Sequence, residues 1–294
     1  MRSLARRHPV GTFLAFAYTA SAAIFAIPFM SKAGIGVIDL ELPGVAPFIL
    51  LSAIALVVSA FVTTALADGR AGVREYRKRV FHFRVHPKFY AAAIVALPGT
   101  AVVTATVVSG AAPVAAIAAN PVIVLGVVIS AVFAFALVNW WEEAAWTGFA
   151  LERIQPRIGP MRASVVTTWM QAVVHLPLVF VAGGVTDGRV APEAIPFYLV
   201  ALFVLPIPVR IVLTYLYNAS GRSVPIAGLY HAGLGVATGV AFIPVIAPDV
   251  NPALVYAGFA VLAAIVAGVT RGRLGYRSEA STVAQSTEVS MAVA

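Results

Sequence analysis

The fold class of this chain is decided by residues 119–141, which read ANPVIVLGVVISAVFAFALVNWW and are followed directly by Glu142 and Glu143. About 20 consecutive apolar residues are enough to cross the hydrocarbon core of a bilayer as an α-helix. A charged side chain at the centre of a membrane helix costs roughly 2.5–3.5 kcal/mol on insertion scales, so carboxylates near membrane helices usually have a function. The stretch therefore predicts a membrane helix whose end carries the first candidates for a functional site.

The composition of the whole chain agrees with a membrane protein. Of the 294 residues, 61% are hydrophobic and 11% are charged, whereas soluble domains have about 45–50% apolar and about 25% charged residues. Cysteine is absent, which excludes disulfides, a thiolate nucleophile and a cysteine zinc site. We therefore expect an all-α integral membrane protein.

Eight stretches of the chain are apolar and long enough to form membrane helices. They lie near residues 10–30, 45–67, 89–110, 119–141, 163–184, 195–217, 224–246 and 252–270. We expect residues 1–277 to form a single polytopic membrane domain. The polar residues 278–294 have no apolar periodicity, and we expect this tail to be disordered.

Lysine and arginine residues gather on one side of the predicted helices. That side has Arg2, Arg6, Arg7, Arg70, Arg74, Arg77, Lys78, Arg79, Arg84, Lys88, Arg153, Arg157, Arg162, Arg271, Arg273 and Arg277, and Arg210 and Arg222 flank the next turn on the same side. The opposite side has only Lys32 and Arg189. The positive-inside rule places the basic side, and with it both termini, in the cytoplasm. The alanine- and valine-rich composition is compatible with a bacterial protein, and we expect the protein in the cell membrane.

The basic loop at residues 70–88 interleaves arginine with aromatic residues. A basic segment beside a membrane typically lies on anionic lipid headgroups. We therefore expect this loop to contact anionic lipid, and we favour lipid over nucleic acid as its partner.

Beyond the two glutamates, the candidates for chemistry inside the predicted helices are His175 and His231. A carboxylate can take a proton from water as a general base, while imidazoles hold the water or stabilise an oxyanion. Two histidines and one carboxylate are also a ligand set of catalytic zinc sites. Both patterns indicate hydrolysis, and the alternative is a buried polar cluster that only fixes helix packing.

The two glutamates are expected to have different roles. Adjacent residues on a helix point about 100° apart. Glu142 and Glu143 therefore cannot face the same point, and we expect one to be the base while the other supports it.

Three segments, in order along the chain, resemble the motifs of a known family. The first begins Glu142-Glu143-Ala144-Ala145-Trp146-Thr147, the second ends in His175-Leu176-Pro177, and the third is Tyr230-His231-Ala232. They resemble the motifs EExxxR, FxxxH and HAxxN or HAxxD of the CAAX protease and bacteriocin-processing (CPBP, also called Abi) family of intramembrane proteases. The resemblance covers a core of about residues 120–245.

The resemblance implies an intramembrane endopeptidase that hydrolyses a peptide bond of a peptide or protein near the membrane surface. In that role Glu142 activates the attacking water, His175 helps to hold it, and His231 stabilises the oxyanion. Glu143 supports the site. The family has been described both as metalloproteases and as metal-free glutamate proteases, so the resemblance implies either no cofactor or a Zn²⁺ ion bound by Glu142, His175 and His231.

Three supporting positions depart from the family motifs: Thr147 replaces arginine, Gln171 replaces phenylalanine, and Gly235 replaces asparagine or aspartate. We therefore expect Glu143 to lack a strong cationic partner, and the oxyanion to lose one hydrogen-bond donor. Gln171 and Asn218 are candidates to replace lost hydrogen bonds. The alternative function is that of a catalytically silent family member, which acts as a membrane scaffold or a bacteriocin self-immunity factor.

Overall fold

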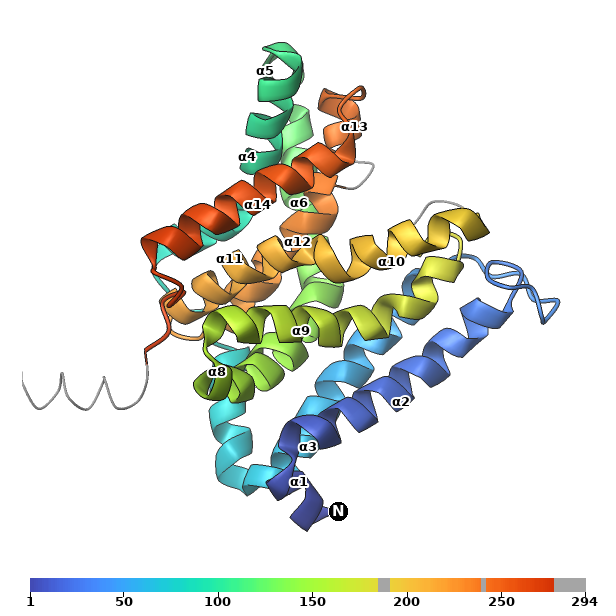
Figure 1. Ribbon diagram of the computed structural model, residues 1–294, viewed down its shortest axis with the longest axis vertical. Helices are drawn as coiled ribbons and strands as arrows, with labels where there is room; N and C mark the ends of the chain where they lie inside the picture. Colours follow the sequence, from blue (N-terminus) through green and yellow to red (C-terminus); the bar gives the residue numbers. More distant parts are fainter. Residues whose placement is uncertain (185–190, 239–241, 278–294) are drawn as a thin grey trace, which may run out of the picture.

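A computed structural model describes residues 1–184, 191–238 and 242–277, and this part of the chain is helical, without a strand (Figure 1). The all-α fold predicted for a membrane protein is confirmed. Two features of the sequence, the tail at residues 278–294 and Arg189, lie outside the described residues.

The first part of the chain forms α1 (Arg2–Arg7), α2 (Pro9–Met30), α3 (Ala46–Val80), α4 (Pro87–Ser109), α5 (Ala112–Ala119) and α6 (Val122–Ala134). A continuous helical stretch then follows α6 through the π-helix η1 (Phe135–Asn139), α7 (Trp140–Glu143), the π-helix η2 (Ala144–Leu151) and α8 (Glu152–Ile158). The remainder forms α9 (Pro160–His175), the 3₁₀-helices η3 (Leu176–Phe180) and η4 (Pro192–Ala194), α10 (Ile195–Val204), α11 (Pro206–Ala219), α12 (Val224–Thr238), α13 (Ile243–Ile246) and α14 (Pro252–Val269).

Seven helical segments of the described chain are long and apolar enough to cross a membrane. They are Pro9–Met30, Ala46–Val80, Pro87–Ser109, Val122–Ile158, Pro160–Phe180, Pro192–Ala219 and Val224–Ile246, the last of which runs over residues 239–241. The eighth predicted helix, near residues 252–270, forms α14 and is shorter than the others. With 18 residues at 1.5 Å each, α14 is about 27 Å long, slightly less than a hydrocarbon core of about 30 Å.

Two predicted helices extend beyond the ends that hydropathy gave them. The predicted helix 45–67 and much of the basic loop at 70–88 are both part of α3, which is interrupted at Gly69 by a φ of 67° and a ψ of −158°. Most residues after Gly69 are good helix formers such as alanine, arginine, lysine and glutamate, so the chain turns helical again as far as Val80. The predicted helix 119–141 likewise continues to Ile158, and Glu142 and Glu143 therefore lie within a helical stretch instead of at its end.

Segments that the charge pattern assigned to one side of the membrane meet at one end of the molecule. Arg222 Nη1, after α11, lies 2.8 Å from Glu152 Oε1 at the start of α8. The Ser223 hydroxyl donates to the carbonyl oxygen of His82, between α3 and α4, at 2.6 Å. These contacts agree with the alternation of sides, and the cytoplasmic orientation stays a prediction.

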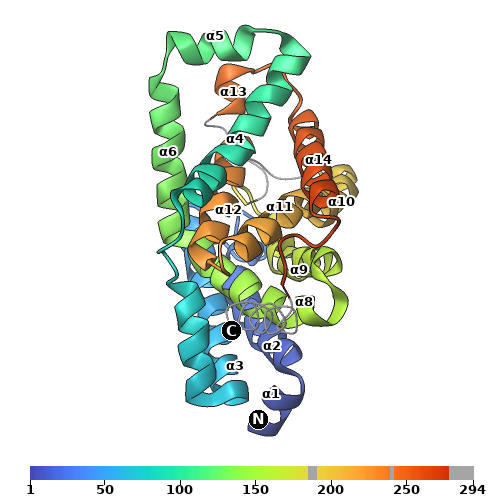
Figure 2. The ribbon, with the colours of Figure 1, turned by 90° about the vertical axis from the view of Figure 1, so that its left-hand side faces the viewer.

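The most buried membrane segment is the one that contains α12, which packs against α4, α6, α7 and α11 (Figure 2). Small residues allow this close packing, because they let helix backbones approach each other. At Gly228, a Cβ atom would lie only 2.8 Å from the Cα atom of Trp140. His231 follows Gly228 by about one helical turn, so this approach brings His231 beside α7.

Candidate active site

Glu142 and Glu143 occupy a single α-helical turn between the two π-helices η1 and η2. π-Helical segments are rare and are frequent at functional sites. The hydroxyl of Tyr76, on α3, donates to the carbonyl oxygen of Ala144 at 2.9 Å and fixes the end of this turn. Both glutamates are buried, since Glu142 is 5% exposed and Glu143 is 0% exposed.

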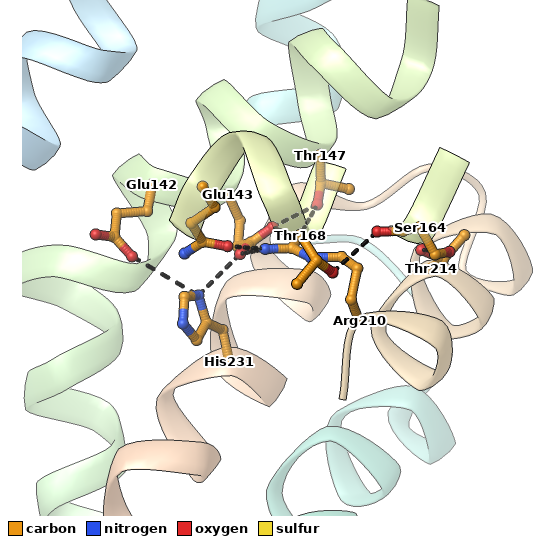
Figure 3. A network of polar contacts seen from close by, with 9 residues as sticks. Glu142, Glu143, Thr147, Ser164, Thr168, Arg210, Thr214 and His231 are labelled. Atoms are coloured by element: carbon orange, nitrogen blue, oxygen red, sulfur yellow. Dashed lines mark hydrogen bonds and ion pairs between the residues drawn. The ribbon is translucent and has the colours of Figure 1, made fainter. Parts of the chain in front are cut away.

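The carboxylate of Glu143 is paired with Arg210 of α11 (Figure 3). Arg210 Nη1 donates to Glu143 Oε2 at 2.6 Å, and Nη2 donates to Oε1 at 3.0 Å. The hydroxyl of Thr147 also donates to Oε2 and accepts from Arg210 Nη1 at 3.0 Å, while the side-chain oxygen of Gln171 accepts from Nη2. Two-pronged pairs of this kind are among the strongest hydrogen-bonded interactions in proteins. Glu143 is therefore held in one position from several sides.

The prediction that Glu143 lacks a cationic partner is wrong, because Arg210 supplies the positive charge from another helix. Thr147, at the motif position of arginine, contributes a hydroxyl group to the same carboxylate. The sequence did contain a signal for this partner. Arg210 lies inside the predicted helix 195–217, and charged residues within membrane helices almost always pair with one another.

Glu142 faces both of the predicted histidines. Its Oε1 atom lies 3.7 Å from His175 Nε2, and its Oε2 atom lies 3.8 Å from His231 Nδ1. His231 Nδ1 also lies 2.8 Å from Glu143 Oε1, although this contact lacks hydrogen-bond geometry (Figure 3). The structure brings Glu142, His175 and His231 together from three different helices, and their catalytic roles stay a prediction.

The ring of His175 has a defined tautomer. Its Nδ1 atom lies 3.0 Å from the carbonyl oxygen of Gln171, which can only accept a hydrogen bond. Nδ1 therefore carries the proton in the neutral ring, and the lone pair of Nε2 faces Glu142. The gap of 3.7 Å between Nε2 and Glu142 Oε1 is too long for a direct hydrogen bond, but one water molecule can bond to both atoms.

A cavity of about 620 Å³ opens beside these side chains. This volume lies within the range of about 300–1,000 Å³ that is usual for ligand pockets, and most of the lining is apolar. The polar side chains that line it belong to Ser130, Asn139, Thr168, Gln171, His175, Arg210, His231, Thr238 and Tyr256. His175 and His231, which face Glu142, are part of this lining, so the cavity is a candidate ligand site beside the glutamates.

Asn139 is one of the polar lining residues that the sequence analysis missed. It ends η1 three residues before Glu142, a spacing that places both side chains on one face of the helix. Within the described residues, Asn139 forms no side-chain hydrogen bond, so its amide group is available to a ligand. The signal in the sequence was the position of a polar amide at the end of the apolar stretch 119–141.

Of the two other supporting candidates, Gly235 lies at the site and Asn218 does not. Gly235 lines the cavity, and a Cβ atom there would have no neighbour within 4 Å. Asn218, by contrast, bonds to Gln155 at 3.2 Å and to the carbonyl oxygen of Leu274 at 3.0 Å, at the far end of α11. It lies two helical turns, or about 12 Å, beyond Arg210 along α11. The structure therefore does not bring Asn218 to the site.

The donor groups do not fit a zinc site in their observed arrangement. Within the described residues, no three side chains of histidine, cysteine, aspartate or glutamate are placed to hold one metal ion. The closest set is Glu142, His175 and His231, and the Nδ1 atom of His231 lies nearer to Glu143 than to Glu142.

Comparison with known proteins identifies the family. No curated protein with which the chain was compared matches it. A family model described as type II CAAX prenyl endopeptidase Rce1-like matches residues 123–277, which are more than half of the chain and include Glu142, His175 and His231. This match confirms the resemblance to CAAX proteases that the three motifs indicated. The chain is a multi-pass membrane protein that belongs to the type II CAAX prenyl endopeptidase Rce1-like family of intramembrane endopeptidases.

Proposed function

We propose that this protein hydrolyses a peptide bond inside the 620 Å³ cavity, with Glu142 as the general base. The observation that carries the proposal is the gap between Glu142 Oε1 and His175 Nε2, which one water molecule can bridge. Glu143, one residue further on, is paired with Arg210, whereas within the described residues Glu142 has no cationic partner other than the two histidines. Glu142 is therefore the carboxylate that is free to accept a proton.

The reaction begins when Glu142 takes a proton from the bridging water and the oxygen of that water attacks the carbonyl carbon of the peptide. The C=O π bond opens, and the negative charge moves to the carbonyl oxygen. When the tetrahedral intermediate collapses, the C–N bond breaks and Glu142 returns the proton to the leaving amine. His175 accepts a hydrogen bond from the water through Nε2 and orients it for attack.

The oxyanion needs hydrogen-bond donors near the point of attack, and two candidates line the cavity. One is His231, beside both glutamates. The other is Asn139, whose amide group supplies the donor that Gly235 lacks. Donors of this kind act strongly because the site excludes water and holds them in place before the reaction.

The substrate that we propose is a membrane-anchored peptide or protein, cleaved where its chain enters the cavity. Support comes from the family description, which names a prenyl endopeptidase, and from the apolar lining beside the polar groups. A lipid-modified C-terminal peptide has the combination of an apolar anchor and a polar scissile bond that this lining accommodates.

The test is a cleavage assay with the purified full-length protein in lipid nanodiscs and a library of membrane-anchored peptides, with and without a lipid group. We expect Glu142→Gln to reduce the cleavage rate by about 10²–10⁴-fold, the usual contribution of a general base. Glu193→Gln is the matched control, because Glu193 is exposed at the start of η4 and should not affect the rate. A metal chelator should leave the rate unchanged.

Two outcomes would overturn the proposal. Equal cleavage by the native protein and by Glu142→Gln would remove Glu142 from the mechanism, and loss of activity with a chelator that is reversed by Zn²⁺ would replace it with a metal mechanism. If neither protein cleaves any peptide but both bind the library equally, the alternative of a catalytically silent scaffold or immunity factor gains support. The open space at Gly235 is the observation that favours this alternative.

A further inference from the structure

An open depression of about 1,100 Å³ lies where α3 ends, away from the candidate active site. Its wall is formed by the end of α3, the segment that joins α3 to α4, and the turn after α11. Six cationic residues line it: Arg74, Arg77, Lys78, Arg79, Arg84 and Arg222. Glu75 is the one carboxylate among the lining residues, so the depression is strongly positive.

Three of these arginines have no carboxylate partner within the described residues. Glu75 is shared by Lys78 at 2.9 Å and Arg74 at 3.8 Å, and Arg222 is paired with Glu152. That leaves Arg77, Arg79 and Arg84, and the buried Nε atom of Arg79 has no hydrogen-bond partner. Several guanidinium groups without a carboxylate are suited to bind an anion with several oxygen atoms, such as a phosphate group.

The position of the depression indicates where that phosphate comes from. It lies where the membrane segment Ala46–Val80 ends and the segment Pro87–Ser109 begins, and lipid headgroups are expected beside such segment ends. Phe81 and Phe83 are part of its lining and are 47% and 41% exposed. Exposed aromatic rings beside arginines are typical of a membrane interface, where the rings contact lipid and the cations contact phosphate. We propose that this depression binds the phosphate group of an anionic phospholipid.

The walls of the depression are connected to the helices of the candidate active site. Trp140, two residues before Glu142, donates through Nε1 to the carbonyl oxygen of Val80 at 2.9 Å. Its ring packs edge-on against Phe81 and Phe83, with centroids 5.3 and 5.1 Å apart. A lipid bound here orders the segment that supports α7. We therefore expect anionic lipid to increase peptide cleavage. This expectation rests on the proposed function.

The binding test compares two double variants of the full-length protein in nanodiscs of phosphatidylcholine with increasing phosphatidylglycerol. Arg77→Gln with Arg84→Gln removes two exposed arginines of the depression, and Arg2→Gln with Arg6→Gln removes two exposed arginines from a separate hollow near α1. The phosphatidylglycerol that copurifies with each protein is measured by native mass spectrometry. We expect at least about a tenfold loss of bound phosphatidylglycerol for the first variant and less than about a twofold loss for the second, because specific guanidinium–phosphate contacts are lost only in the first.

Three results would overturn the proposal. An equal loss in both double variants would mean general attraction of basic residues to anionic lipid. Full displacement of the lipid by millimolar inorganic phosphate would mean a site for soluble phosphate. Binding of a single-stranded oligonucleotide that depends on Arg77 and Arg84, without any dependence of lipid binding on them, would mean a nucleic-acid site. Because lipid retention is measured without a peptide substrate, its outcome is independent of whether the protein is a protease.

Discussion

Glu143 and Glu142 differ in how completely the charge of each carboxylate is compensated. Glu143 is 0% exposed and receives hydrogen bonds from Arg210 and Thr147. Among the described residues, the ionisable partners of Glu142 are the two histidines, at 3.7 and 3.8 Å. The divergence of about 100° between adjacent helical residues turns one carboxylate into the ion-pair network and the other toward the histidines that line the cavity.

This difference teaches how a membrane site can contain a reactive carboxylate and still fold. The network around Glu143 ties α7, α9 and α11 together through paired charges. Glu142 makes no hydrogen bond to a protein group within the described residues, so a proton acceptor remains available for water. Glu143 therefore connects three helices, whereas the proposed function makes Glu142 the reactive group.

The largest effect is expected for Arg210→Met, which leaves the carboxylate of Glu143 buried without its cation. Breaking one partner of a buried pair typically costs about 3–5 kcal/mol in the free energy of unfolding. The measurement is unfolding of the purified protein in mixed detergent micelles. The double variant Arg210→Met with Glu143→Gln should recover much of that loss, because both buried charges are removed together.

The matched control is Arg222→Met, which removes a more exposed ion pair. The side chain of Arg222 is 36% exposed and that of Glu152 is 13% exposed, so solvent screens much of their interaction. We expect a loss of no more than about 1 kcal/mol. Equal losses of unfolding free energy for Arg210→Met and Arg222→Met would contradict the view that the ion pair of Glu143 holds the helices together.

The next effect concerns catalysis and not stability. Asn139→Ala should lower the cleavage rate by about 10²–10³-fold, the usual consequence of losing one oxyanion donor, with little change in unfolding. Adding Gly235→Asn should restore part of the rate, because an asparagine at that position has room and lines the same cavity. Steady-state kinetics in nanodiscs measures both variants, and the loss should appear in kcat more than in KM.

Two results would remove Asn139 from the mechanism. One is a rate loss in Asn139→Ala that is matched by a loss of unfolding stability, because a structural role explains both. The other is the same gain from Gly235→Asn in the native protein and in the Asn139→Ala variant, since a shared role requires that one donor replaces the other.

The smallest effect is expected where α12 meets α7. Gly228→Ala places a methyl group 2.8 Å from the Cα atom of Trp140, so the two helices must separate. Overpacking of this kind costs about 1–3 kcal/mol. Gly235→Ala on the same helix is the control and should be neutral or stabilise by up to about 1 kcal/mol, because its methyl group meets nothing. Thermal unfolding is measured by circular dichroism. Equal changes in the unfolding temperature of the two variants would contradict this prediction.

The membrane segments could be predicted from sequence because hydropathy over about 20 residues reports on burial in lipid. The ends of two segments could not, since charged residues such as those after Gly69 end an apolar window but do not end a helix. After the interruption at Gly69, the backbone of α3 is helical again as far as Val80. Hydropathy therefore located the membrane segments but underestimated the length of two helices.

The candidate site was predictable only in part. Glu142, His175 and His231 could be named because each is an isolated ionisable residue in a motif, and the structure brings them together. The partner of Glu143 could not be derived from spacing, because Arg210 lies 67 residues away and meets it only after α11 packs against α9 and α12. Asn139 was missed because a single amide at the end of an apolar stretch has no distinguishing pattern.

The position of Arg210 also has a consequence for biosynthesis. An arginine at position 147 would enter the membrane on the same helix as Glu143, four residues later. Here the cation is 67 residues behind, which at about 5–20 residues per second corresponds to roughly 3–13 s of translation. During that interval, the carboxylate leaves the ribosome with only the hydroxyl of Thr147 as a nearby partner on its own helix. The ion pair of Glu143, in the fourth membrane segment, therefore forms only after the sixth segment has been synthesised.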